Sequence, residues 1–310
     1  MSNMTKDFLY VIMTPPPNPK SAGITYLNNL GNYLRSLGKK VANIYHIEPQ
    51  GSLYLWSSVT IPSTNHWKEP WQGAWIPWSQ GIFRRTFGET PFILIHGENK
   101  HYKWFEGLNV VRYYLAGIND LQKKGVPRDG EFKLAWDSMY CDNPDFLLQK
   151  PMFRGDLNSL LRHDLKGRNL DLTYVGKAWI HNPNTPRLRD TLELKRDWPE
   201  SDEEYLFLLS KTRLLFTYDS ITSVVSDAIL MGAFPVFLDS AKRNDLKWYK
   251  SISEQLSGCF CFFGDSYEEY LINFPSNREK YILSTISNDG QYILSLKKFC
   301  DVVETFFAKT

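Results

Sequence analysis

The chain has 310 residues, of which 43% are hydrophobic and 23% are charged, and its formal net charge is +2. This length favours two compact domains, and the composition is that of an ordinary globular protein whose core needs no disulfide bonds. The small net charge, without a basic patch interleaved with aromatic residues, argues against nucleic acid as a partner.

The cysteines and the N-terminal segment indicate the cellular compartment of the protein. The four cysteines show no paired C-x-x-C spacing, which favours buried free thiols in a reducing cytoplasm over a zinc site or a disulfide. The polar segment Met1–Asp7 is not typical of a signal peptide, and no apolar stretch approaches the ~20 residues of a spanning helix. We therefore expect a cytoplasmic protein.

The first half of the chain alternates between expected strands and helices. Residues 8–13 predict a buried strand, residues 24–37 an amphipathic helix ended by Gly38, and residues 41–47 a second strand. A strand–helix–strand unit of this kind implies a parallel sheet. Farther along, the patterns predict a strand or two with long loops at 50–90, a strand at 92–95, a helix at 110–115 and a strand at 132–136.

The second half repeats this alternation. The patterns predict strands at 170–175, 191–196, 214–218 and 234–238, and helices at 202–210, 222–231 and 292–307. We therefore expect an α/β fold of two Rossmann-like domains with parallel sheets that face a central cleft. The expected domains are residues 1–152 and residues 153–290, with a C-terminal helix, 291–310, that crosses back to the first domain.

The strongest candidate site follows the strand expected at 214–218. In open parallel sheets, ligands bind at the carboxyl ends of strands, and a helix start binds phosphate through free N–H groups and its dipole. A helix cap alone explains one polar residue here, but not a second carboxylate eight residues after Asp219. The candidate ligand-binding residues are Tyr218, Asp219, Ser220, Thr222, Ser223 and Asp227.

This segment, with Gly232 and Pro235 after it, resembles the donor-binding motif of GT-B glycosyltransferases. In that motif two acidic residues separated by seven flank a strand-to-helix turn. Both acids are aspartates here, where glutamate is usual, and one extra residue separates Gly232 from Pro235. The resemblance implies that Asp227 contacts the donor ribose and that the turn at 220–223 holds the diphosphate.

Three other stretches resemble the same superfamily. Ser21-Ala22-Gly23 is similar to its glycine loop, which makes Gly23 a donor-binding candidate, and Tyr174–Lys177 is similar to a strand end that carries a phosphate-neutralising cation. Residues 92–98 and 109–113 resemble bacterial polysaccharide glycosyltransferases. The resemblance implies a nucleotide-sugar donor on the second domain and a glycan, lipid-linked or protein acceptor on the first. It also implies a role in surface glycans such as lipopolysaccharide or capsule.

The charge of the donor must be neutralised. No Asp-x-Asp of the metal-holding kind is present, so we expect no metal and no other cofactor, and we assign neutralisation to Lys177 with Arg196, or with Arg187 or Arg189. His96 and Glu98 follow a strand and are candidates for the general base, although either could be a loop residue bonded to backbone. Inversion at the anomeric carbon requires such a base, and retention does not.

Two other functions remain open. One is a sugar-nucleotide epimerase or hydrolase on the same frame, and the other is a non-catalytic module that binds nucleotide sugars. A dinucleotide oxidoreductase is disfavoured because no Gly-x-Gly-x-x-Gly follows any strand. The short length indicates trimmed loops and either a homodimer or a membrane-associated partner at the cytoplasmic face of the inner membrane.

Overall fold

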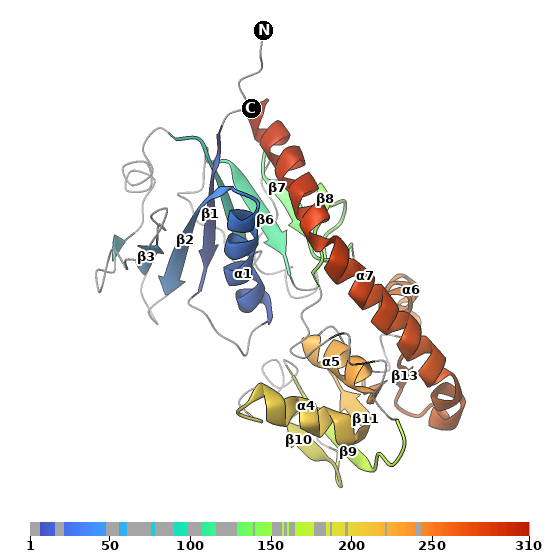
Figure 1. Ribbon diagram of the computed structural model, residues 1–310. Coiled ribbons are helices and arrows are strands. Elements are labelled where there is room, and N and C mark those ends of the chain that lie inside the picture. Colours follow the sequence, from blue (N-terminus) through green and yellow to red (C-terminus); the bar gives the residue numbers. More distant parts are fainter. Residues whose placement is uncertain are drawn as a thin grey trace. The chain divides into compact units, whose positions relative to one another are not determined.

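The structure is a computed structural model that divides into two compact units (Figure 1). Unit 1 comprises Met1–Lys150 and Gln291–Thr310, and unit 2 comprises Pro151–Gly290. The residues that the structure describes are 7–15, 22–47, 56–60, 76–77, 90–97, 107–115, 129–138, 140–150, 157, 160, 165–176, 184–186, 188–195, 198–220, 222–239 and 243–309.

Unit 1 is built on one mixed sheet. Six parallel strands lie in the order β2-β1-β5-β6-β7-β8, and two antiparallel strands, β3 and β4, continue the sheet beyond β2. The strands are β1 (Leu9–Thr14), β2 (Lys40–Ile47), β3 (Trp56–Thr60), β4 (Ile76–Pro77), β5 (Phe92–Gly97), β6 (Val110–Tyr114), β7 (Phe132–Ala135) and β8 (Phe146–Leu147).

One face of this sheet is covered by α1 (Ala22–Ser36) and by the end of α7 (Tyr267–Ala308) (Figure 1). The ring of Tyr26 on α1 meets that of Tyr113 on β6, and Phe132 on β7 meets Phe299 and Phe306 on α7. Leu27, Leu30 and Leu34, three of the apolar residues at helical spacing that predicted α1, are buried. The opposite face carries a second buried cluster, formed by Val11, Met13, Ala42, Ile44, Leu94 and Val110.

One sequence prediction in unit 1 was wrong. Residues 110–115, expected as a helix, form strand β6, which pairs in parallel with β5 and β7. Two valines and two tyrosines favour a strand, because β-branched and aromatic side chains suit the pleated surface. All five residues of β6 are buried, so both faces of the strand lie in the core, and the alternation that marks a half-exposed strand is absent.

Unit 2 has a five-stranded parallel sheet in the order β10-β9-β11-β12-β13. The strands are β9 (Leu170–Tyr174), β10 (Leu192–Leu194), β11 (Thr212–Thr217), β12 (Phe234–Phe237) and β13 (Cys261–Phe262). Besides α7, the helices in the described part of this unit are α4 (Asp202–Lys211), α5 (Ser223–Met231) and α6 (Leu246–Gln255). The predicted α/β class with parallel sheets is confirmed, and the layout is consistent with two Rossmann-like units.

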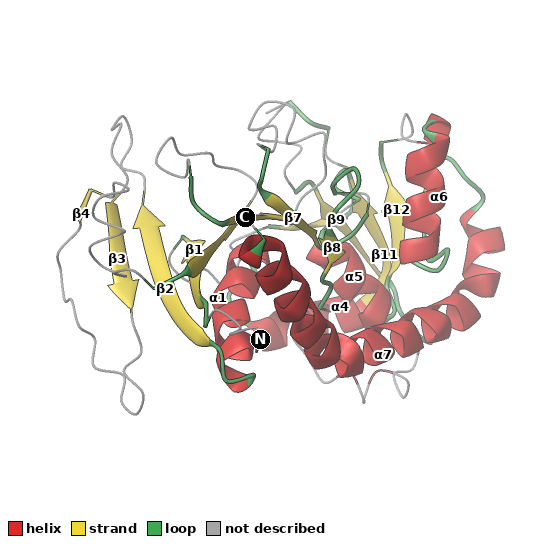
Figure 2. Cartoon of the chain, turned by 90° about the horizontal axis from the view of Figure 1, so that it is seen from above, coloured by secondary structure: helices red, strands yellow, loops and turns green. Residues whose placement is uncertain are grey.

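The C-terminal part of unit 2 holds elements that the sequence did not predict. Helix α6 lies beside β12 (Figure 2), where Trp248 meets the ring of Phe237, and β13 follows it. Helix α7 begins at Tyr267, well before the expected start at residue 292. Pro275 lies inside α7, and such a residue normally ends or kinks a helix, which hid this part of the helix from the sequence pattern.

The prediction that the cysteines are buried free thiols is confirmed. Cys141, Cys259, Cys261 and Cys300 are free and buried. Burial raises the pKa of both Cys259 and Cys261 to about 12, so these thiols stay protonated at neutral pH. Among the helices that the structure describes, none has an apolar stretch long enough to cross a bilayer.

Candidate functional site

The strand order of unit 2 reverses between β9 and β11. From β9 the chain moves outward to β10, and from β11 it moves in the other direction, to β12 and β13. The two central strands pair with Tyr174 next to Thr217, so their carboxyl ends lie side by side. In open α/β sheets such a switch point is where ligands bind. The expected segment 218–223 leaves the sheet at this point.

The loops after β9 and β11 approach each other closely. Gly176 has a φ of +61°, and a Cβ atom built there would lie 2.7 Å from the Cβ of Asp219 and 2.9 Å from its Oδ2. The backbone N–H of Asp219 donates to the Thr217 hydroxyl over 3.0 Å, which fixes the turn that follows β11. Asp219 is half-buried. The structure therefore holds a carboxylate at the switch point, against a position that only glycine occupies without strain.

Helix α5 begins directly beyond this turn. Thr222 is its N-cap, in an extended conformation, and its side chain accepts from the N–H of Val224. Ser220 is buried, while Thr222 and Ser223 are half-buried. The N–H groups of the first helical turn and the positive end of the helix dipole face this corner, a combination suited to anions.

The other end of α5 is held by two arginines. Arg278 of α7 donates to the carbonyl oxygens of Ile229 and Leu230 over 3.0 and 2.6 Å, and Arg168 donates to that of Met231 over 2.7 Å. Burial and the nearby Arg168 lower the pKa of Arg278 to about 10, so it remains charged at neutral pH. These cations satisfy the negative end of the helix dipole and fix α5 in place.

Asp227 lies inside unit 2. It is 0% exposed, and the hydroxyl of Tyr205 on α4 donates to its Oδ2 over 2.9 Å. The turn at 218–223 and Asp227 thus lie at the start and in the middle of one short helix, and the Asp227 carboxylate accepts a hydrogen bond from α4. Its role toward a ribose stays a prediction.

The other expected residues are divided among several places. Lys177, Arg196 and Glu98 lie outside the described residues. Gly23 lies in the first turn of α1, where an added Cβ would meet Leu115 at an ordinary 3.8 Å. His96 stands near the carboxyl end of β5, beside β1, where the strand order of unit 1 reverses.

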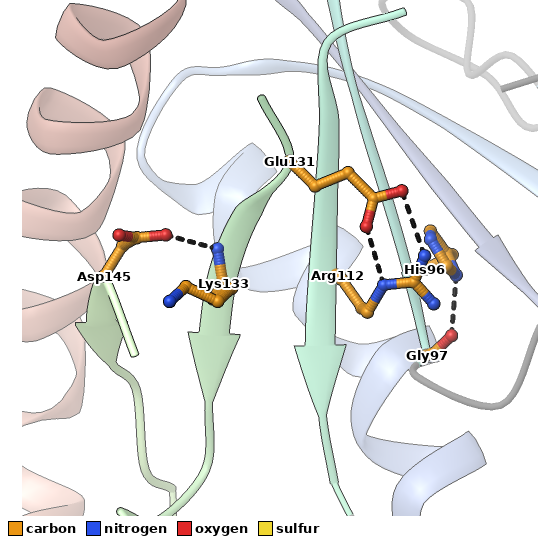
Figure 3. A network of polar contacts seen from close by, with 6 residues as sticks. All are labelled: His96, Gly97, Arg112, Glu131, Lys133 and Asp145. Atoms are coloured by element: carbon orange, nitrogen blue, oxygen red, sulfur yellow. Dashed lines mark hydrogen bonds and ion pairs between the residues drawn. The ribbon is translucent and has the colours of Figure 1, made fainter. Parts of the chain in front are cut away.

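His96 belongs to a buried polar network in unit 1 (Figure 3). It is 3% exposed, and its Nδ1 lies 2.6 Å from the carbonyl oxygen of Gly97. Its register partner on β6 is Arg112, which is fully buried and forms a bidentate ion pair with Glu131 at 2.8 and 3.0 Å. A charged residue inside the apolar run of β6 was the sequence signal for this network.

Comparison with protein-family models found no match, and no curated protein matches the sequence. Among the described residues, no group of three or more His, Cys, Asp or Glu side chains could hold a metal ion.

Proposed function

We propose that the chain is a GT-B-type glycosyltransferase that moves a sugar from a nucleotide-sugar donor to a glycan, lipid-linked or protein acceptor. The observation that carries the proposal is the switch point of unit 2, where Gly176 and Asp219 meet at the start of α5. We further propose that it acts without a metal in bacterial surface-polysaccharide synthesis, in the cytoplasm, at the inner face of the membrane.

The donor diphosphate is assigned to the start of α5. Its negative charge meets the N–H groups of the first turn, beside which lie the half-buried residues Thr222 and Ser223. The arginines at the far end of α5 support this assignment, since they offset the negative end of the helix dipole. Lys177 and Arg196 are assigned as further cations for the diphosphate, and Asp227 as the acceptor for the ribose hydroxyls.

The acceptor is assigned to unit 1. In the transfer step, the acceptor hydroxyl oxygen bonds to the anomeric carbon while the bond from that carbon to the diphosphate oxygen breaks. The electron pair leaves with the nucleoside diphosphate. The hydroxyl proton passes to His96 or Glu98 if the configuration inverts, and to the leaving phosphate if it is retained.

Two variants test donor binding, one at each partner of the hydrogen bond between Tyr205 and Asp227. Asp227→Asn is expected to weaken nucleoside diphosphate binding about tenfold, because the ribose loses a charged acceptor. Tyr205→Phe removes only the internal donor to Asp227 and is expected to leave the affinity unchanged. Calorimetry with a panel of nucleoside diphosphates measures both. Equal affinities in the two variants and the unaltered chain would remove Asp227 from the donor site.

Turnover separates the proposed transferase from its alternatives. A transferase consumes the nucleotide sugar only when an acceptor is present, whereas a hydrolase or epimerase acts on the donor alone. A binding module is stabilised thermally by the donor but turns nothing over. If no nucleoside diphosphate or nucleotide sugar raises the melting temperature, the proposal fails as a whole.

The catalytic assignment has its own test. His96→Ala and Glu98→Ala are expected to lower turnover by about a hundredfold or more in an inverting enzyme, since each removes a candidate base. Donor affinity should stay unchanged in both, because neither residue belongs to unit 2. Full activity in both variants would show that neither His96 nor Glu98 acts in catalysis.

A further inference from the structure

The C-terminal end of α5 is capped by a side chain from another helix. The last turn of α5 holds no basic residue of its own. Instead, Arg278 donates to the carbonyl oxygens of Ile229 and Leu230, and over 2.9 Å to that of Leu160. Arg278 is 5% exposed, and no carboxylate in the described part of the chain pairs with it. A buried guanidinium therefore places its charge against the negative end of the helix dipole.

Arg168 reaches the same end of α5, and a glycine makes room for it. Arg168 donates to the carbonyl oxygen of Met231 over 2.7 Å, and to those of Leu209 and Thr212, at the end of α4, over 3.2 and 3.1 Å. Gly232 follows α5 with a φ of +90°, and a Cβ added there would lie 2.7 Å from Nη2 of Arg168. The glycine of the sequence motif thus admits a second cation to this end of the helix.

The neighbouring helices α4 and α5 differ at their N-terminal ends. Helix α4 begins with Asp202, Glu203 and Glu204, whose charges offset the positive end of its own dipole. The first turn of α5 holds no acidic residue. Helix α5 therefore combines an N-terminal turn without acids with a C-terminal end that meets the cations of Arg168 and Arg278. This asymmetry favours the binding of an external anion at the start of α5.

We infer that Arg278 is a positioning residue for the donor diphosphate, on which it acts through α5 without contact. Its hydrogen bonds fix the helix that presents the N–H groups, and its charge attracts an anion at the other end of that helix. The nine residues of α5 span about 14 Å. At this distance, and at an effective dielectric constant of about 20, one charge changes the affinity for each phosphate charge by about sevenfold. The inference rests on the proposed donor site at the start of α5.

Calorimetry with the tightest-binding member of a panel of nucleoside diphosphates, and with its parent nucleoside, tests the inference. Arg278→Gln keeps hydrogen-bond donors but removes the charge. It is expected to lower the affinity for the diphosphate by about fivefold or more and to leave that for the uncharged nucleoside unchanged. Arg278→Lys keeps the charge and should bind the diphosphate within about twofold of the unaltered chain. Arg168→Gln removes the other cation, should act as Arg278→Gln does, and replaces that variant if it does not fold.

Arg213→Gln is the matched control, because it makes the same change of charge at a side chain that is 53% exposed. Solvent screens this charge, so the affinity for the diphosphate should stay unchanged. Equal losses for nucleoside and diphosphate in Arg278→Gln would show that Arg278 supports only the fold, and would overturn the inference. Full affinity for the diphosphate in both Arg278→Gln and Arg168→Gln would overturn it too, while the donor site would stand. If the unaltered chain binds no nucleoside diphosphate, the proposed donor site and the inference both fail.

Discussion

Replacing Glu131 with leucine is expected to destabilise the sheet of unit 1 by about 3–5 kcal/mol, because it leaves a buried guanidinium without its counter-charge. Arg112 is 0% exposed, and Glu131 supplies both oxygens of its bidentate ion pair. Native-state hydrogen exchange of the β6 and β7 amides measures this change, and exchange should accelerate by about two to four orders of magnitude.

Two further variants show whether burial is the cause. Arg112→Met combined with Glu131→Leu removes both charges, and most of the lost stability should return. Asp171→Asn breaks the bidentate pair with Arg213, whose side chain is 53% exposed, and should cost about 1 kcal/mol or less. If the Glu131 and Asp171 variants lose the same free energy of unfolding, the burial of Arg112 is not the cause of the loss.

Much of the fold could be predicted from apolar runs. The strands predicted at 8–13, 41–47, 92–95, 170–175 and 234–238 are short, largely apolar runs bounded by turn residues, and each proved to be a strand that pairs in parallel with a neighbour. The prediction of a helix at 110–115 failed because a short apolar run fits a buried helix as well as a buried strand. This segment forms a strand because its backbone groups pair with those of β5 on one side and those of β7 on the other.

The candidate site was predictable only where it is local in sequence. A strand followed at once by Asp219, Ser220 and a capped helix can be read from consecutive residues. The contact between Gly176 and Asp219 cannot, because it depends on β9 and β11 being neighbours in the sheet. The same holds for Arg278, which reaches Ile229 from a helix that starts after the whole sheet is complete.

The burial and the partners of the polar residues also could not be predicted from the sequence. Asp227 was expected at a ribose on the grounds of its spacing from Asp219, and the sequence gives no sign of Tyr205 as its partner. Helical spacing places a residue along the axis and on a face, but the neighbouring element decides what that face meets. This is why the variants of Asp227 and Tyr205 have to be measured as a pair.

Replacing Gly176 with alanine is expected to weaken both the fold of unit 2 and its binding of nucleoside diphosphates. A positive φ costs an alanine about 1–2 kcal/mol, and the added Cβ would lie 2.7 Å from the Cβ of Asp219 and 2.9 Å from Cε1 of Tyr174. One of the two loops must therefore move, which we expect to raise the total cost to about 3 kcal/mol or more. Chemical denaturation and calorimetry measure the two effects.

Gly167 provides the matched control, because it has a similar φ of +72° and no atom within 4 Å of an added Cβ. Gly167→Ala should therefore show only the backbone cost of about 1–2 kcal/mol and unchanged nucleotide affinity. Both variants carry the cost of a positive φ. The difference between their free energies of unfolding therefore measures the effect of the close approach of Gly176 to Asp219. If Gly176→Ala loses stability but binds nucleoside diphosphates as the unaltered chain does, the switch point of unit 2 is packed for the fold alone, and the donor must be sought elsewhere.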